Sequence, residues 1–172
     1  MWVTDSGRGP GRLTYKSTMS TTERFFLDKS DPGSWRALNG LALKVHAATE
    51  AAGIPRSVVE LLNVRVSQIN GCAYCLDLHG RLALEAGVGN RQLAVLPVWR
   101  ETELFTDLER AAPSIGEAAA LLSEDGARQA ELQRARLVLT DEQFSALQWA
   151  GIAINSFNRV SILSRHPVRA RS

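Results

Sequence analysis

Residues 60–87 read ELLNVRVSQINGCAYCLDLHGRLALEAG, and the fold follows from how this stretch divides. Apolar residues recur at helical spacing up to Asn70, on the face formed by Val58, Leu62, Val66 and Ile69. Asn70-Gly71 breaks this pattern, and a second helical pattern runs from near Cys72 to Gly87. The stretch therefore predicts two helices that fold back on each other across Asn70-Gly71.

Helical patterns account for the rest of the chain as well, without an alternating strand pattern or an internal repeat. Capping and breaking residues set the expected helices, whose approximate spans are 35–51, 55–70, 72–87, 91–98, 107–122, 127–137 and 141–163. Because no single helix can bury itself, the chain is predicted to form a compact all-α bundle of about six to eight helices.

Local signals refine four of these boundaries. Ser34 is expected to cap the first helix, and Pro113 to kink the fifth helix or divide it in two. Residues 123–126 read SEDG and predict a turn. Thr140 and Gln143 are spaced as a capping box, which opens the last helix.

Composition bounds the class of protein. The chain has 172 residues, of which 45% are apolar and 22% charged, which is typical of one globular domain. A net charge of +2 does not favour nucleic-acid binding, and no apolar run is long enough for a membrane span. Residues 1–18 are expected to be a disordered extension of a domain at 19–172, with Met19 a candidate initiator. Because the N-terminus lacks an apolar signal core, a cytoplasmic location is expected.

The only two cysteines, Cys72 and Cys75, are spaced as a redox pair, and His79 follows them by one helical turn. At about 100° per residue, the three side chains fall within roughly 60° on one helix face. Cys72 stands in the first turn, where the positive helix end favours a thiolate. His79 is placed to accept or return a proton. The pattern predicts thiol redox chemistry.

Glu60 is a fourth candidate, because it interrupts an apolar run where a charge needs a partner. Antiparallel packing of the two helices brings it beside the cysteines, where it could orient His79. A structural zinc site is the alternative for the cysteines, but His46 and His166 have no spacing that completes four ligands. We therefore expect neither a metal nor a cofactor.

The pattern E-x11-C-x2-C-x3-H in residues 60–79 resembles the signature of the AhpD-like alkylhydroperoxidases, in the carboxymuconolactone decarboxylase family. The resemblance extends to residues 97–109 and 153–159 and covers roughly residues 20–163. It implies an all-α fold, assembly as a trimer or as a hexamer of dimers, and reduction of hydroperoxides. It also implies a dithiol electron donor, such as a lipoylated or thioredoxin-like protein.

The resemblance implies that Cys75 attacks the peroxide and becomes a sulfenic acid, and that Cys72 condenses with it to a disulfide. Glu60 and His79 form the proton relay. The helix-end argument instead favours Cys72 as the more acidic thiol. Tyr74 is a departure, because the better-characterised hydroperoxidases carry a relay histidine at that position.

Two other functions are kept open: a lactone decarboxylase, after the family's name, and a non-catalytic redox-sensing oligomeric module. Polar residues also interrupt the apolar last helix at Asn155, Asn158 and Arg159. We expect them to bond neighbouring helices or a subunit interface, rather than to line the active-site mouth.

Overall fold

The computed structural model describes residues 24–122 and 124–168, and this part of the chain contains eight α-helices, one 3-10 helix and no strand. The elements are α1 (Leu27–Ser30), α2 (Pro32–Ala51), α3 (Arg56–Asn70), α4 (Ala73–Glu85), α5 (Asn90–Val95), η1 (Leu96–Glu101), α6 (Asp107–Leu121), α7 (Asp125–Arg136) and α8 (Asp141–Leu163). The predicted all-α bundle is confirmed. The expected extension at residues 1–18 and the candidate initiator Met19 lie outside the described residues.

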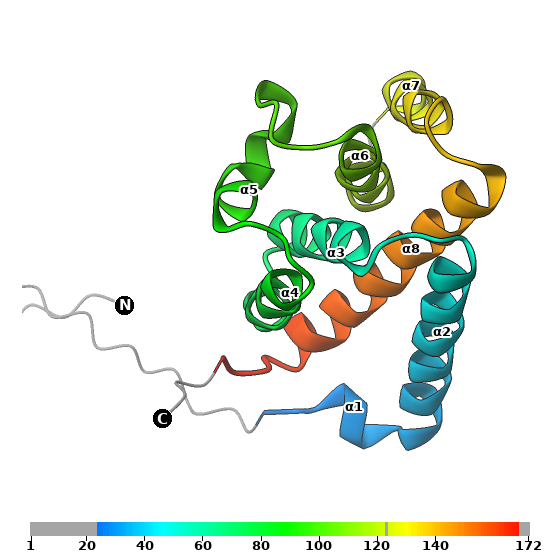
Figure 1. Ribbon diagram of the computed structural model, residues 1–172. Helices are drawn as coiled ribbons and strands as arrows, with labels where there is room; N and C mark the ends of the chain where they lie inside the picture. The colour runs from blue at the N-terminus through cyan, green and yellow to red at the C-terminus, as the bar shows by residue number, and fades with distance from the viewer. Residues whose placement is uncertain (1–23, 123, 169–172) are drawn as a thin grey trace, which may run out of the picture.

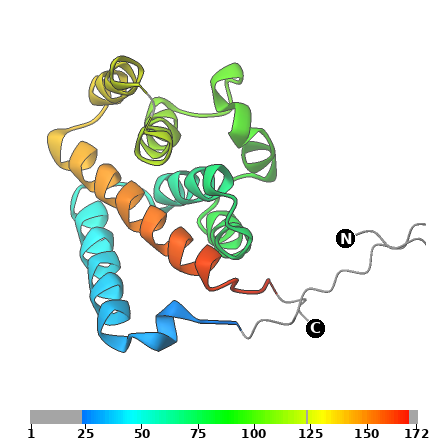
Figure 2. The ribbon, with the colours of Figure 1, turned by 180° about the vertical axis from the view of Figure 1, so that it is seen from behind.

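Helix α3 lies at the centre of the bundle, between α4, α6 and α8, while α2 packs along α8 on the outside (Figure 1). Side chains of α3 enter two apolar cores. Leu62 and Val66 pack with α6 and α8, whereas Leu61 and Val64 pack with α4 and η1. Seen from behind, α2 and α8 diverge toward the ends of the described chain (Figure 2). The helix with the cysteine motif is thus anchored on the central helix, in which Leu61, Leu62 and Val66 are fully buried.

The predicted break between the two central helices is confirmed. Gly71 ends α3 in the left-handed conformation at φ 68°, a region that glycine enters without steric cost. Cys72 then stands as the N-cap residue of α4. The reversal at Gly71 sends α4 back along α3, as the sequence predicts.

Two boundary predictions are wrong in detail, and one of the two alternatives for Pro113 is excluded. The N-cap of α2 is Asp31 rather than Ser34, because the Asp31 carboxylate accepts from the N–H groups of Gly33 and Ser34. Pro113 does not divide its segment, since α6 is one helix with every residue from 111 to 118 buried. Tertiary packing outweighs the lost backbone hydrogen bond there. Residues 125 and 126 belong to α7 and not to a turn.

Two of the three polar residues of α8 bond to a neighbouring helix, as expected, whereas Arg159 donates to Asn155 of its own helix. Asn70 at the end of α3 donates to the side-chain oxygens of Asn155 and Asn158, both at 2.8 Å. Asn158, fully buried, donates in turn to Ser67 Oγ at 3.1 Å. The capping box of Thr140 is confirmed at the start of the same helix. None of the described helices has the length and apolar character needed to cross a bilayer.

Candidate active site

The two cysteines stand at the N-terminal end of α4, Cys72 as its N-cap residue and Cys75 in its first turn. They are joined as a disulfide, with their Cα atoms 5.3 Å apart. Cys72 Sγ accepts a hydrogen bond from the Cys75 N–H at 3.3 Å. The N-terminal end of a helix favours a thiolate, and Cys75 belongs to this end of α4 as Cys72 does. The helix-end argument from the sequence therefore applies to both thiols.

Glu60 reaches the site from α3 and bonds directly to His79 on α4. The distance from Glu60 Oε2 to His79 Nδ1 is 2.7 Å. The side chain of Glu60 has no exposed surface, and two residues of its own helix complete its contacts. Arg56 Nε donates to Oε1 at 2.5 Å, and Asn63 Nδ2 donates to Oε2 at 3.3 Å. The predicted antiparallel approach of Glu60 to His79 is thus present.

Glu60 is ionised near neutral pH despite its burial. Burial by itself raises the pKa of the Glu60 carboxyl, but the hydrogen bond and charge of His79 and the charge of Arg56, with Asn63, lower it further. The net pKa lies below the ordinary value of 4.5. An ionised carboxylate only accepts hydrogen bonds, so Nδ1 of His79 carries the hydrogen. In the neutral ring, Nε2 is then left as a base.

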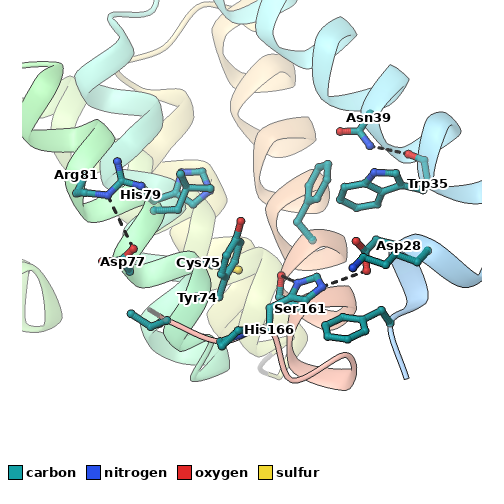
Figure 3. Close-up of a pocket in the computed structure, with 16 residues that line it drawn as sticks. Asp28, Trp35, Asn39, Tyr74, Cys75, Asp77, His79, Arg81, Ser161 and His166 are labelled. Carbon is teal, nitrogen blue, oxygen red and sulfur yellow. Dashed lines mark hydrogen bonds and ion pairs between the residues drawn. The ribbon is translucent and has the colours of Figure 1, made fainter. Parts of the chain in front are cut away.

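A cavity of about 730 Å³ opens beside the motif, and both Cys75 and His79 line it (Figure 3). Its walls come from α1, α2, α4, α8 and the segment after α8. Cys75 is 3% exposed, so this cavity is its contact with the surroundings, whereas Cys72 does not line it. The geometry gives an incoming molecule access to Cys75.

His79 also lines a second cavity of about 360 Å³ between α2, α3 and α8. Glu60, Arg56 and Asn63 line this second space, but neither cysteine does. His79 therefore lines both the cavity that Cys75 lines and the cavity that Glu60 lines.

One residue at the site was missed by sequence reasoning. His166 lines the first cavity and bonds through Nε2 to Asp28 Oδ1 at 3.1 Å. Its ring packs 5.4 Å from that of Tyr74. Because Asp28 and His166 stand at opposite ends of the described chain, no local spacing could have indicated the pair. His46, in contrast, forms an exposed pair with Glu50 on α2.

Among residues 24–122 and 124–168, no group of three or more His, Cys, Asp or Glu side chains is arranged to hold a metal ion. The acidic and basic side chains at the site are instead bonded to one another. The arrangement is that of a disulfide with a hydrogen-bonded carboxylate and imidazole nearby.

The chain resembles known proteins both in sequence and in structure. A model of the carboxymuconolactone decarboxylase family matches residues 34–118. The uncharacterised protein YdfG of Bacillus subtilis (strain 168) is 33% identical over 114 residues, which cover 66% of this chain and 78% of YdfG. This chain belongs to the carboxymuconolactone decarboxylase family.

Within that family the chain is AhpD-like. A crystal structure from Agrobacterium tumefaciens, of a protein of unknown function described as an AhpD antioxidant defence candidate, superposes with a TM-score of 0.76 at 28% identity. The match covers 86% of this chain and 99% of that chain. The alkyl hydroperoxide reductase AhpD of Methylobacterium sp. (strain 4-46) is 44% identical over 41 residues, 24% of this chain and 23% of that protein.

Proposed function

We propose that this protein is a cysteine-based antioxidant enzyme that reduces organic hydroperoxides through Cys72 and Cys75. One observation supports this most directly: the buried couple of Glu60 and His79 lies beside a disulfide whose Cys75 opens onto a cavity. A purely structural disulfide needs neither a base nor a cavity. The AhpD-like relatives point to the same class of function.

The first step is attack of Cys75 on the peroxide. His79 Nε2 takes the proton of the Cys75 thiol, and the thiolate attacks the terminal oxygen of the hydroperoxide. The O–O bond breaks, the sulfur is oxidised to a sulfenic acid, and the alkoxide leaves as an alcohol with the proton from His79. Glu60 holds the ring through Nδ1 and stabilises the imidazolium that forms in between.

Condensation and reduction complete the cycle. The Cys72 thiolate attacks the Cys75 sulfenic acid, so that the S–O bond breaks and a disulfide forms. The departing hydroxide takes the proton given up by the Cys72 thiol and leaves as water. The short Cα–Cα distance of 5.3 Å permits this step within one helical turn. An external dithiol then reduces the disulfide and becomes a disulfide itself. We propose a lipoylated or thioredoxin-like protein as the donor, in the cytoplasm, and a trimeric or hexameric assembly.

Cys75 is the better candidate than Cys72 for the attacking thiol, because only Cys75 lines the cavity. Tyr74, which stands in place of a relay histidine, leaves His79 and Glu60 as the acid–base couple of the site. The proposed relay therefore has two members rather than three.

The test is reduction of cumene hydroperoxide with dihydrolipoamide as the donor. We expect wild-type protein to turn over and Cys75→Ser to fall to the uncatalysed background. Cys72→Ser should stop after one turnover and accumulate a sulfenic acid on Cys75 that dimedone traps. Asp141→Asn, which alters a carboxylate in a surface ion pair at the start of α8, serves as the control and should retain activity.

Equal rates for wild type and Cys75→Ser would exclude the peroxidase. An oligomer that changes size on oxidation, in the absence of turnover, would instead favour the redox-sensing module. A sulfenic acid trapped on Cys72 rather than on Cys75 would reverse the assigned roles of the two thiols.

A further inference from the structure

The cavity beside Cys75 is closed on one side by the two ends of the described chain. Residues 26–28, at the start, and residues 164–166, after α8, meet there, and we call these two segments the terminal clip. Leu27 N–H donates to Ser164 Oγ at 3.0 Å, and Asp28 bonds to His166 at 3.1 Å. Figure 3 shows Asp28, Ser161 and His166 together on the wall that faces Tyr74 and Cys75.

The second half of the clip is turned back onto α8. Arg165 adopts a left-handed conformation at φ 50°, which costs conformational energy for a residue other than glycine. His166 N–H then bonds to the carbonyl of Ser161 at 3.0 Å. Ser164 is almost fully buried at this point. The chain therefore accepts a strained turn that places His166 over the cavity.

His166 is not available as a proton carrier for Cys75, because both of its ring nitrogens are engaged. Nε2 bonds to Asp28, and Nδ1 lies 3.3 Å from Ser161 Oγ. The side chain is only 15% exposed. These contacts fix the ring in position and orientation, which is the property of a positioning residue rather than of a base.

The fixed ring contacts two aromatic side chains, stacked on one and tilted against the other. Phe26 lies on one side at 5.6 Å with the planes 19° apart, and Tyr74 on the other at 5.4 Å with the planes 59° apart. Tyr74 immediately precedes Cys75 and lines the same cavity. The clip thus holds in place the aromatic wall closest in sequence to the reactive sulfur.

The charged side chains on this wall are engaged with neighbours. Lys29 lies over the ring of Phe26 at 4.7 Å, and Arg81 lies 3.9 Å from Asp77. With Asp28 held by His166, the cavity lining carries two acidic residues, Asp28 and Asp77, and two basic residues, Lys29 and Arg81, so that its formal charges balance. Its discrimination between incoming molecules therefore rests on width more than on charge.

We propose that the terminal clip determines which molecules reach Cys75. His166, fixed by Asp28 and Ser161, holds Tyr74 beside the sulfur and restricts access to slender reactants, such as a linear hydroperoxide or an extended dithiol arm. The identity of these reactants rests on the proposed function. The restriction on the width of reactants that reach Cys75 applies whatever reaction this thiol performs.

Alkylation of the reduced thiol measures this restriction without reference to peroxidase activity. In a Cys72→Ser background only Cys75 can react, and its rates with iodoacetamide and with a pyrenyl maleimide compare a slender reagent with a broad one. We expect His166→Ala and Asp28→Ala each to raise the maleimide rate about tenfold while the iodoacetamide rate changes little. Asp141→Ala, which removes a surface aspartate away from the cavity, should leave both rates unchanged.

Each other outcome is informative. If both clip variants retain the wild-type ratio of the two rates, the clip does not select by width. Equal increases for both reagents would indicate general loosening and overturn the proposal as well. Should His166→Ala not fold, Asp28→Ala tests the same contact from the other half of the clip. Changed selectivity in a protein without peroxidase activity would retain the clip and refute only the proposed function.

Discussion

Glu60 is a carboxylate without exposed surface whose three partners are all polar side chains from α3 and α4. A buried charge is costly unless it is paired, and Glu60 meets this condition with a cation on one oxygen and a histidine on the other. Because this pairing requires the ionised carboxylate, its contribution to stability depends on pH. Its folded-state pKa lies below the ordinary value, so ionised Glu60 stabilises the fold.

Acid titration of stability tests this residue. A depressed folded-state pKa contributes stability that is fully present above the unfolded value of about 4.5 and is lost as the pH falls through the folded value. We expect the free energy of unfolding, measured with urea, to decline as the pH falls below about 4.5. Glu60→Gln should weaken this decline and should cost about 1–3 kcal/mol at neutral pH, because Arg56 and His79 lose a charged acceptor.

The matched control is Glu50→Gln, since Glu50 also stands four residues after its basic partner on a helix but is exposed. It should have little effect on stability. If Glu60→Gln retained the acid dependence of the wild type, another carboxyl would be responsible and the account of Glu60 would be wrong.

At the scale of elements, the contact between α3 and α6 depends on the absence of a side chain at Gly116. A Cβ atom there would lie 3.0 Å from Val66 Cγ2 and 3.4 Å from Leu62 Cγ. Both neighbours are fully buried and belong to the larger core. The small residue thus permits the close packing of the helix that carries Glu60.

Two glycine-to-alanine substitutions should therefore have opposite signs. Gly116→Ala is expected to lower the free energy of unfolding by about 1–3 kcal/mol through overpacking. Gly40→Ala, inside α2 with nothing within 4 Å of the new Cβ, should raise it by roughly 0.5–1 kcal/mol. Urea unfolding followed by circular dichroism compares them. A stabilising Gly116→Ala would show that α6 can shift away from α3 without loss.

The elements that the sequence predicts well are those with short-range signals. The signals for the helix end at Gly71 and for the capping box at Thr140 each lie within a few residues of sequence, and the structure confirms both. The single helix through Pro113 could not be predicted, because burial against three other helices decides it. The same reason applies to the pair of Asp28 and His166, whose 138 residues of separation leave no local trace. The approach of Glu60 to His79 was predictable because only one reversal separates them.

At the scale of the molecule, Glu117 connects the parts that surround the two cores. From α6 it accepts hydrogen bonds from Arg65 on α3 at 2.7 Å, and from Trp99 and Arg100 on η1 at 3.1 and 2.7 Å. Glu117 is buried, and it is the acceptor that these three donors share. The network fixes η1, which closes the smaller core, to the central helix.

Removal of this acceptor should weaken the whole fold. Glu117→Ala leaves the Trp99 indole N–H without its acceptor and removes the carboxylate from Arg65 and Arg100, which retain Gln68 and Glu131. We expect a loss of about 1–3 kcal/mol in the free energy of unfolding. Glu103→Ala is the control, since Glu103 pairs with Arg110 from a fully exposed position and should matter little. Similar effects of the two variants would mean that the network is not what joins the cores.

The hydrogen bond from the Leu27 amide to Ser164 Oγ also offers a way to detect ligand binding. Its proton can exchange with solvent only when the ends of the described chain separate. A molecule seated in the adjoining cavity contacts both ends and must leave before they part, so its binding free energy adds to the cost of opening. The hydrogen-exchange rate of the Leu27 amide therefore reports whether a ligand occupies the cavity, in a measurement that does not require turnover.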